Sequence, residues 1–475
     1  MSGSDLPLLM SSARTLRSLC GLIVASSISF TLSCSGGGDV RAAENRPSIV
    51  VISIDSLRAD RMSLYGHDRD TTPILDRLAP ESVVYERAHS TANWSLISHA
   101  SLLTGTYPSQ HGVVNRETCL PEDLPTLASR LSAEGYHTIG LHFPGWLDRS
   151  FGFDRGFDHY EVHENAEQAS EHLEAALDAR PTDRPFFLFV QLYDVHNANL
   201  RGRRAMMYDP PPPFDRIYDP DARLVMGNAD VSALWTRDGR EATDMQRDAI
   251  LALYDGCVRY VDHKIGTWIE RLDEEGVFDD ALFCVTAPHG EGLLDHSTVY
   301  RGHGDVFEEG LRVPLLVRYP GGARGGTRDE SLVSLVDVAP TALDLLGAEG
   351  GGFLSGRSLL RPVEQEPILF AERQDVRVIY LWPWKLVDAP GLRKDRLIHL
   401  ENDPLERTNL IEQGQRGQHD PIYLEIQARA LARRAAHEVP SGSRVRIIPP
   451  PPQDQKLLQS LGYGGEAATG GDRGD

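Results

Sequence analysis

Cysteine is scarce in this chain of 475 residues. Two of the five cysteines, Cys20 and Cys34, lie within the first 34 residues. The remaining three, Cys119, Cys257 and Cys284, cannot all pair with one another, and none stands in a CxxC spacing. Neither a disulfide framework nor a zinc ribbon is indicated, and buried free thiols are expected instead.

Basic residues are also in short supply. The 48 Lys and Arg residues are outnumbered by 69 Asp and Glu residues, which leaves a formal net charge of −21 at pH 7. Binding to a nucleic-acid backbone needs a basic face, so nucleic acid is excluded as the main partner. A local basic pocket for one small anion remains compatible with this charge. The hydrophobic content of 41% and the charged content of 25% are those of a globular protein with a large core.

Long apolar runs are missing after the N-terminus. Arg14 and Arg17 precede a mainly apolar stretch over residues 19–32, which is too short to span a membrane and typical of a signal peptide. Cys34 and the Gly/Ser residues after it resemble a bacterial lipoprotein signal. We therefore predict a leader over residues 1–34 and a flexible tether over residues 35–45. The exported protein is expected to be a periplasmic or cell-envelope lipoprotein attached to the membrane through lipidated Cys34, or otherwise a cleaved and secreted protein.

Buried strands alternate with amphipathic helices along the chain. Apolar runs rich in β-branched and aromatic residues predict strands over residues 48–54, 137–143, 186–193, 281–287 and 313–319. Helical patterns occupy residues 124–134, 161–180 and about 242–275. This alternation predicts an α/β fold with a large, mostly parallel sheet flanked by helices, whose ligands gather at the carboxyl ends of the strands.

The sequence divides into a large domain over residues 46–364 and a smaller C-terminal α+β subdomain over residues 365–440. Short strands in the subdomain are predicted over residues 368–370, 378–380 and 384–386, and a closing helix over residues 421–438. Residues 201–227, with Arg201, Arg203 and Arg204 and a run of four prolines, are interpreted as an insertion loop near the active face. The tail over residues 441–475 is expected to be disordered after about residue 463.

Polar or ionisable residues follow several of the predicted strands. Asp55 comes directly after the first strand, His196 follows the strand over residues 186–193, and His289 and His303 follow the strand over residues 281–287. Ser95 begins an expected helix, where the positive end of the helix dipole favours an anion. Taken singly, each residue also fits a helix cap or a structural histidine. Together, at one strand-end crevice, they predict a shared site for a polyatomic anion.

The order and spacing of these segments resemble the sulfatase family, within the alkaline-phosphatase-like superfamily. The resemblance runs from about Arg46 to Leu410. The matching segments are residues 46–66, 94–105, 107–112, 311–315, 336–341 and 400–404.

The resemblance implies a sulfate ester substrate and a divalent cation, usually calcium, held by acidic side chains and the nucleophile. By position, Asp55 corresponds to a metal ligand, Ser95 holds the place of the nucleophile, and His289 lies at the second metal-binding segment. His196 and His303 sit where the family contacts the sulfate or protonates the leaving oxygen. His99 occupies the place of an Arg that supports the nucleophile.

Two carboxylates of the family pattern are missing. The tandem Asp-Asp after the first strand is here Asp55-Ser56, and the Asp-His pair is Pro288-His289. Calcium prefers about six to eight oxygen ligands, so zinc, manganese and an empty metal site are the alternatives. Candidate replacements for the lost carboxylates are Glu291, Asp295 and His296.

The modification motif is also altered. The family pattern, Cys or Ser followed by x-Pro-x-Arg, reads Ser95-Leu96-Ile97-Ser98-His99. Because both Pro and Arg are missing, the sequence favours a Ser95 that is not converted to formylglycine.

Three functions follow from these observations. The leading hypothesis is an exported sulfatase-family hydrolase that cleaves a small or polymeric sulfate ester, or a related anionic ester, at a metal-assisted site with Ser95 as nucleophile. The second is a phosphodiesterase or phosphotransferase that uses unmodified Ser95. The third is a non-catalytic pseudosulfatase that keeps the fold to bind a sulfated glycan or a partner.

Overall fold

The computed structural model describes residues 46–196, 208–227, 243–293, 295–296, 306–348, 354–373, 376–389, 395–411 and 416–436. The predicted leader, tether and tail, the arginines at 201, 203 and 204, and His303 lie outside the described residues. Within the described ranges, no helix combines the length and the apolar character needed to cross a bilayer.

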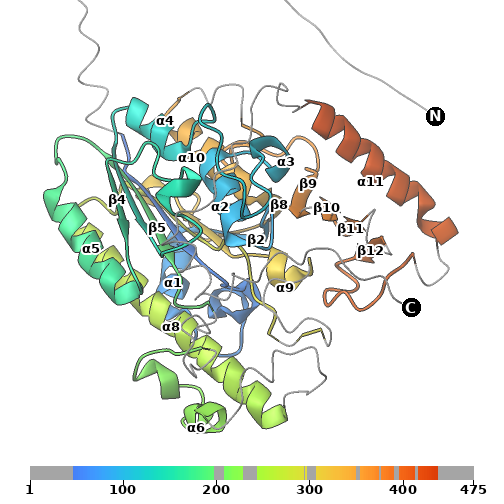
Figure 1. The fold of residues 1–475 in the computed structure, drawn as a ribbon, viewed down its shortest axis with the longest axis horizontal. Coiled ribbons are helices and arrows are strands. Elements are labelled where there is room, and N and C mark those ends of the chain that lie inside the picture. Colours follow the sequence, from blue (N-terminus) through green and yellow to red (C-terminus); the bar gives the residue numbers. More distant parts are fainter. Residues whose placement is uncertain are drawn as a thin grey trace, which may run out of the picture. The chain divides into compact units, whose positions relative to one another are not determined.

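An eight-stranded sheet forms the centre of the large domain, with strand order β4–β3–β5–β1–β6–β7–β2–β8 (Figure 1). The strands in chain order are β1 (Ile49–Ile54), β2 (Val83–His89), β3 (His137–His142), β4 (His159–Val162), β5 (Phe186–Leu192), β6 (Leu282–Thr286), β7 (Leu315–Arg318) and β8 (Thr327–Ser334). Strand β7 runs antiparallel to both of its neighbours, and the other described pairings are parallel. The predicted α/β fold with a mostly parallel sheet is confirmed.

The middle of the sheet is the part that hydrophobic patterning predicts best. Strands β1 and β5 are buried at every residue, as expected for parallel strands covered on both faces. Strands β2, β4 and β8 were not predicted, because charged residues such as Glu86, Glu161 and Glu330 interrupt their apolar runs.

The helix predicted from residue 161 begins later than expected. Helix α5 covers Ala166–Ala179, and the side chain of Asn165 accepts a hydrogen bond from the backbone N–H of Gln168 at its start. The preceding residues instead pair with β3 as the edge strand β4. The helix predicted from residue 161 therefore includes the end of β4 and the cap residue Asn165, and α5 itself begins at Ala166.

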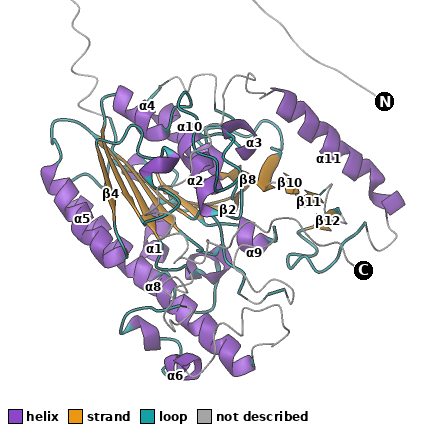
Figure 2. Cartoon of the chain, in the orientation of Figure 1, coloured by secondary structure: helices purple, strands orange, loops and turns teal. Residues whose placement is uncertain are grey.

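Helices cover both faces of the sheet (Figures 1 and 2). Helices α5 and α8 (Asp244–Glu274) lie on one face, while α2 (Ser95–Thr104), α4 (Leu127–Ala133) and α10 (Val338–Leu345) lie on the other. Shorter helices are α1 (Pro73–Leu78), α3 (Pro108–His111), α6 (Ala222–Gly227) and α9 (Glu308–Leu311). The 31 residues of α8 correspond to about 46 Å of helix.

Helix α8 also holds the loop that follows β1. The hydroxyl of Tyr254 donates to the carbonyl of Ser56 at 2.7 Å and accepts from the backbone N–H of Arg58 at 3.0 Å. On its other side the Tyr254 ring packs edge-on against Tyr208, with ring centroids 5.1 Å apart. The described part of the predicted insertion, residues 208–227, therefore packs against α8.

The C-terminal subdomain is an antiparallel four-stranded sheet. Its strand order is β12–β11–β10–β9, and helix α11 (Arg416–Ala436) packs against it. The strands are β9 (Leu369–Arg373), β10 (Val376–Leu381), β11 (Trp384–Asp388) and β12 (Arg396–His399). The first three coincide with the predicted short strands, and β12 was not predicted.

A buried ion cluster joins the two sheets. Lys385 on β11 is completely buried, and its Nζ lies 2.9 Å from Glu308 Oε1 and 2.8 Å from Glu406 Oε1. Glu308, on α9, also accepts a hydrogen bond from the hydroxyl of Tyr380 at 2.8 Å and lies 2.9 Å from His89 Nε2 at the end of β2. The subdomain is thus fixed to the large domain by charges that are largely shielded from water.

Replacing Lys385 by Met is expected to destabilise the protein strongly. The substitution leaves two buried carboxylates without their cation, which costs about 3–5 kcal/mol in the free energy of unfolding. Chemical unfolding followed by tryptophan fluorescence measures the change. The control is Arg361→Gln, which removes an exposed ion pair with Asp344 and should change stability little. Equal unfolding midpoints for Lys385→Met and the wild type would contradict the expectation.

Stability should fall as the pH falls, in part because of His111. This side chain is fully buried, accepts the backbone N–H of Val113 at Nδ1, and pairs through Nε2 with the hydroxyl of Ser101. Burial lowers its pKa from 6.5 to about 3. Below pH 6.5 His111 binds a proton in the unfolded chain but not in the folded chain. This difference lowers the free energy of unfolding by about 2 kcal/mol at pH 5.

The substitution His111→Gln tests this pH dependence. The variant is expected to lose about 2 kcal/mol less than the wild type between pH 7.5 and pH 5, since Gln does not titrate. Unfolding curves at the two pH values measure the difference. An unchanged pH dependence in the variant would exclude His111 as its source.

Candidate active site

Three neighbouring strands and one helix bring the candidate residues together. Strand β1 lies between β5 and β6 in the sheet. Asp55 follows β1 directly, His289 stands three residues after the end of β6, and Ser95 is the first residue of α2. All three side chains are buried. They meet at the carboxyl edge of the sheet, where α/β proteins place their ligands.

Asp55, Ser95 and His289 form a closed triangle of polar contacts. The Oγ of Ser95 donates to Asp55 Oδ1 at 2.6 Å and lies 3.0 Å from His289 Nε2. The third side, from His289 Nε2 to Asp55 Oδ1, is 3.2 Å. We call this group the Asp55–Ser95–His289 triangle. It differs from a serine-protease relay, because one imidazole nitrogen faces both the hydroxyl and the carboxylate.

The proton count of the triangle shows that it needs a positive charge. The Nδ1–H of His289 donates to the carbonyl of Gly290 at 2.8 Å, so Nε2 of the neutral ring carries only a lone pair. Two acceptors, Asp55 Oδ1 and His289 Nε2, then share the single hydroxyl proton of Ser95. Burial disfavours the charged imidazolium, but the hydrogen bond and charge of Asp55 outweigh it and raise the pKa of His289. The pKa of Asp55 is lowered despite burial, mainly by the same contact with His289.

A divalent cation is the alternative to a proton on His289 as the source of this positive charge. Carboxylate oxygen, hydroxyl oxygen and imidazole nitrogen are a donor set that suits zinc or manganese. Within the described ranges, no three His, Cys, Asp or Glu side chains are grouped so that they could hold a metal ion. The candidate ligands are therefore Asp55, His289 and the hydroxyl of Ser95. Their oxygen and nitrogen lone pairs fit a cation, but they include fewer carboxylates than calcium prefers.

Gln191 is a site residue that the sequence analysis missed. Its Nε2 donates to Asp55 Oδ2, and its Oε1 accepts the backbone N–H of Phe143. The amide thereby holds the carboxylate oxygen that points away from Ser95. The available signal was a buried amide in the otherwise apolar strand Phe186–Leu192.

His99 lies behind the nucleophile position instead of facing it. Its Nδ1–H donates to the carbonyl of Ser95 at 2.8 Å, so its Nε2 accepts from the hydroxyl of Ser53 on β1 at 2.9 Å. Burial lowers its pKa, which keeps the ring neutral. His99 therefore positions α2 against β1, and neither of these two hydrogen bonds involves the Ser95 hydroxyl.

His196 lies beside the triangle. Its ring stacks on Tyr193 at a centroid distance of 4.0 Å and stands edge-on to His289 at 6.4 Å. It is nearly buried and close enough to Asp55 to lower the pKa of that carboxyl group. The structure thus brings His196 to the triangle from the end of β5, while His303 is outside the described residues.

Glu291 is a second buried carboxylate near the triangle. Neither of its oxygens accepts a hydrogen bond among the described residues. Burial raises its pKa to about 7, although the positive charges of His289 and Arg58 act in the opposite direction. Ser56 is the residue at which the sequence analysis expected a second Asp. It has a positive φ of 61°, and its hydroxyl is also without a partner among the described residues.

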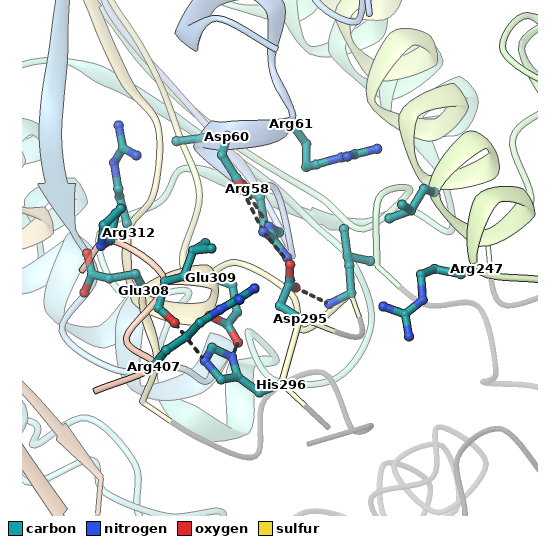
Figure 3. A pocket seen from close by; sticks show the side chains of 15 residues that line it. Arg58, Asp60, Arg61, Arg247, Asp295, His296, Glu308, Glu309, Arg312 and Arg407 are labelled. Atoms are coloured by element: carbon teal, nitrogen blue, oxygen red, sulfur yellow. Dashed lines mark hydrogen bonds and ion pairs between the residues drawn. The ribbon is translucent and has the colours of Figure 1, made fainter. Parts of the chain in front are cut away.

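The other two candidate replacement ligands point elsewhere (Figure 3). Asp295 pairs with Arg58 at 2.5 Å, and His296 Nδ1 lies 2.7 Å from Glu309 Oε1. Both line a cavity of about 360 Å³ together with Arg312 and Arg407. Figure 3 shows Asp295 against Arg58 and His296 against Glu309, so both side chains interact with groups other than Asp55.

The fold and the site together define an alkaline-phosphatase-like hydrolase. A mostly parallel sheet presents Asp55, a helix-borne nucleophile candidate and His289 at one edge, and a small antiparallel sheet follows at the C-terminus. A family model described as "Sulfatase" matches residues 47–348. The chain belongs to the sulfatase family and is a sulfatase-like hydrolase of sulfate esters.

Similar proteins of known name agree with this family. An arylsulfatase of Clostridium perfringens is 24% identical over 462 residues, covering 77% of this chain and 90% of that protein. The phosphonate monoester hydrolase of Agrobacterium radiobacter shares the fold with a TM-score of 0.66 at 22% identity, covering 83% and 96% of the two chains. A structure with bound D-glucosamine-2-N,6-O-disulfate has a TM-score of 0.65 at 17% identity, covering 82% and 98%.

The substitution Gln191→Leu is expected to destabilise the site through Asp55. Losing the donor to a buried carboxylate costs about 1.5–3 kcal/mol in the free energy of unfolding. The same substitution in an Asp55→Asn background should cost at least about 1 kcal/mol less, because the charge is gone. A double-mutant cycle in chemical denaturant measures this coupling, and additive effects would exclude it.

Proposed function

We propose that the protein cleaves a sulfate ester outside the cytoplasm with the Ser95 hydroxyl as the attacking group. The observation that carries the proposal is the Asp55–Ser95–His289 triangle, which places Ser95 Oγ 3.0 Å from His289 Nε2 at the start of α2. Trp94, the N-cap of α2, makes no side-chain capping hydrogen bond. Free backbone N–H groups at a helix N-terminus attract an anionic group such as a sulfate.

The reaction has two balanced steps. In the first, Ser95 Oγ bonds to sulfur and its proton passes to Asp55 Oδ1, which accepts its hydrogen bond at 2.6 Å, while the bond between sulfur and the ester oxygen breaks. The leaving oxygen takes a proton from an acid, the role proposed for His196 beside the triangle. In the second step, a water oxygen bonds to sulfur and passes a proton to His196, the bond between sulfur and Ser95 Oγ breaks, and Asp55 returns a proton to Ser95 as sulfate leaves. A positioned acid or base contributes about 10²–10⁴ to such a rate.

A divalent cation bound by Asp55, Ser95 and His289 would neutralise charge on the transferred group. Other residues of the chain hold Asp55 and Ser95 in position. Gln191 holds Asp55 in place through Oδ2, and His99 fixes the backbone of Ser95 against β1. Export rests on the leader over residues 1–34, and attachment to the membrane on Cys34.

A phosphoryl ester is the second candidate substrate. The residues after Ser95, Leu96-Ile97-Ser98-His99, lack the Pro and Arg of the modification motif, which favours an unmodified hydroxyl. Serine hydroxyls form covalent intermediates in acyl and phosphoryl transfer when an adjacent base activates them. This site offers the same nucleophile to either ester.

The test compares the full chain with Ser95→Ala and His289→Ala variants. Turnover of 4-nitrophenyl sulfate by the wild type is expected to exceed that of Ser95→Ala by at least about 10³-fold. Elemental analysis is expected to show one divalent ion per chain and its loss in His289→Ala. Mass spectrometry of the peptide containing Ser95 is expected to show the mass of an unmodified serine.

Three outcomes contradict parts of the proposal. A peptide mass that is lower by two hydrogens would show that residue 95 is formylglycine, so that the attacking group is not a serine hydroxyl. Turnover of 4-nitrophenyl phosphate without turnover of the sulfate would favour the phosphoryl candidate. A chain that binds no divalent ion and turns over neither ester would be a non-catalytic binding protein.

A further inference from the structure

Three aromatic rings stack on one another beside the triangle. The ring of Tyr193 faces the ring of Phe143 on one side, with centroids 4.2 Å apart and an angle of 9° between the planes. On the other side it faces the ring of His196, at 4.0 Å and 15°. We call this group the Tyr193 stack. The reaction proposed above uses only His196 among its three members.

The order of strands in the large sheet creates the stack. Phe143 follows β3 directly and Tyr193 follows β5 directly. Because β3 and β5 are neighbouring parallel strands, the residues after them meet at the same edge of the sheet. The backbone N–H of Phe143 also donates to Gln191 Oε1 at 3.2 Å, which holds the loop after β3 against β5. Tyr193 is only 7% exposed, so its ring is fixed from behind by Phe143.

The turn that carries His196 is held at its backbone. The N–H of His196 donates to the carbonyl of Tyr193 at 3.0 Å, and Asp194 Oδ1 accepts the N–H of Ala166, at the start of α5, at 3.1 Å. These contacts fix the backbone of His196, but rotation about χ1 and χ2 can still turn its imidazole. The face of Tyr193 limits that rotation, because turning away breaks the stacking contact.

The orientation that the stack favours keeps His196 at the triangle. In this orientation its ring stands edge-on to His289, at a centroid distance of 6.4 Å and an angle of 79°. A general acid works only while its nitrogen is within hydrogen-bond reach of the leaving oxygen. An imidazole that turns away from the triangle therefore loses the role proposed for it.

We propose that Tyr193, backed by Phe143, is the positioning residue that holds the imidazole of His196 where it protonates the leaving oxygen. Tyr193 acts through His196 and transfers no proton itself. This inference rests on the proposed function in taking His196 as the acid. It adds the residue at the end of β5 to those on which the rate depends.

The kinetic test uses two sulfate esters that differ in their need for an acid. The 4-nitrophenolate group leaves readily without a proton, whereas phenolate, the conjugate base of a weaker acid, depends more on receiving one. Because one aromatic contact shifts an equilibrium by up to about tenfold, kcat/KM for phenyl sulfate in Tyr193→Leu should fall about fivefold more than for 4-nitrophenyl sulfate. Tyr193→Phe keeps the ring and should retain the wild-type ratio of the two values.

The matched control is Phe157→Leu. Phe157 stacks on Phe187, near the amino end of β5, at a centroid distance of 5.7 Å. Its loss removes a similar contact from the opposite end of the same strand and should leave the ratio unchanged. Thermal melting identifies any variant that has lost its fold. If Tyr193→Leu has done so, Phe143→Leu replaces it, and the ratio should change in the same direction by about twofold.

A second readout needs no turnover. In the full chain with ¹³C-labelled histidine, the Hε1 resonance of His196 is expected upfield of its position in an unfolded chain, because the imidazole lies over the Tyr193 ring. The resonance that is missing from His196→Gln identifies it. Tyr193→Leu should move this resonance downfield, and Tyr193→Phe and Phe157→Leu should leave it in place.

The outcomes separate this inference from the proposed function. Equal losses for the two esters, or an unmoved His196 resonance, in the variant that breaks the stack overturns the positioning role even where both esters are hydrolysed. A moved resonance in a chain that hydrolyses neither ester supports Tyr193 as the residue that holds His196 and overturns the hydrolase. A moved resonance together with the larger loss for phenyl sulfate supports both.

Discussion

The contact between Asp55 and Ser95 is the constraint on which the rest of the site depends. It ties the carboxyl end of the central strand β1 to the first residue of α2, at an Oγ–Oδ1 distance of 2.6 Å. His289 closes the triangle from β6, Gln191 supports Asp55 from β5, and His99 anchors α2 to β1 from behind. Three strands and one helix thus converge on one buried carboxylate. Because that carboxylate is charged and out of water, each partner has to stay in place.

Ser56 and Pro288, where the sequence analysis expected carboxylates, have different surroundings in the structure. Ser56 has a positive φ and a buried hydroxyl, and neither this hydroxyl nor the carboxyl group of Glu291 has a hydrogen-bond partner among the described residues. At position 288 proline offers no side-chain ligand, and its carbonyl accepts a hydrogen bond from Ser90 instead. The first position still has polar atoms to offer a cation, whereas the second has become part of the backbone framework. A site of this kind favours an ion that is satisfied by few, mixed ligands.

Much of the central sheet and the strand-end residues could be predicted from the sequence. Strands β1, β5 and β6 are continuous apolar runs, and a polar residue after such a run marks the end of the sheet where ligands bind. Strands β2, β4 and β8 could not be predicted in the same way, because the side chains of outer strands are partly solvated and their patterns are mixed. The direction of a side chain was also beyond the sequence. His99 and His289 look alike in a linear pattern, yet one donates to a helix carbonyl and the other faces the nucleophile position. Gln191 was missed for the same reason, since its role exists only once β5 lies beside β1.

The joint between the two sheets has a consequence for the segment that carries Ser95. Lys385 and Glu308 lock the C-terminal sheet to the large domain, and the backbone N–H of Glu372 on β9 donates to the carbonyl of Thr91, just before α2. Asp55, Ser95 and His289 come from the large domain, while one contact to the segment before Ser95 comes from the C-terminal sheet. A substitution that shifts this sheet can therefore displace the start of α2 without touching Asp55, Ser95 or His289. The buried Lys385 thus couples the position of the C-terminal sheet to the segment that carries the nucleophile candidate.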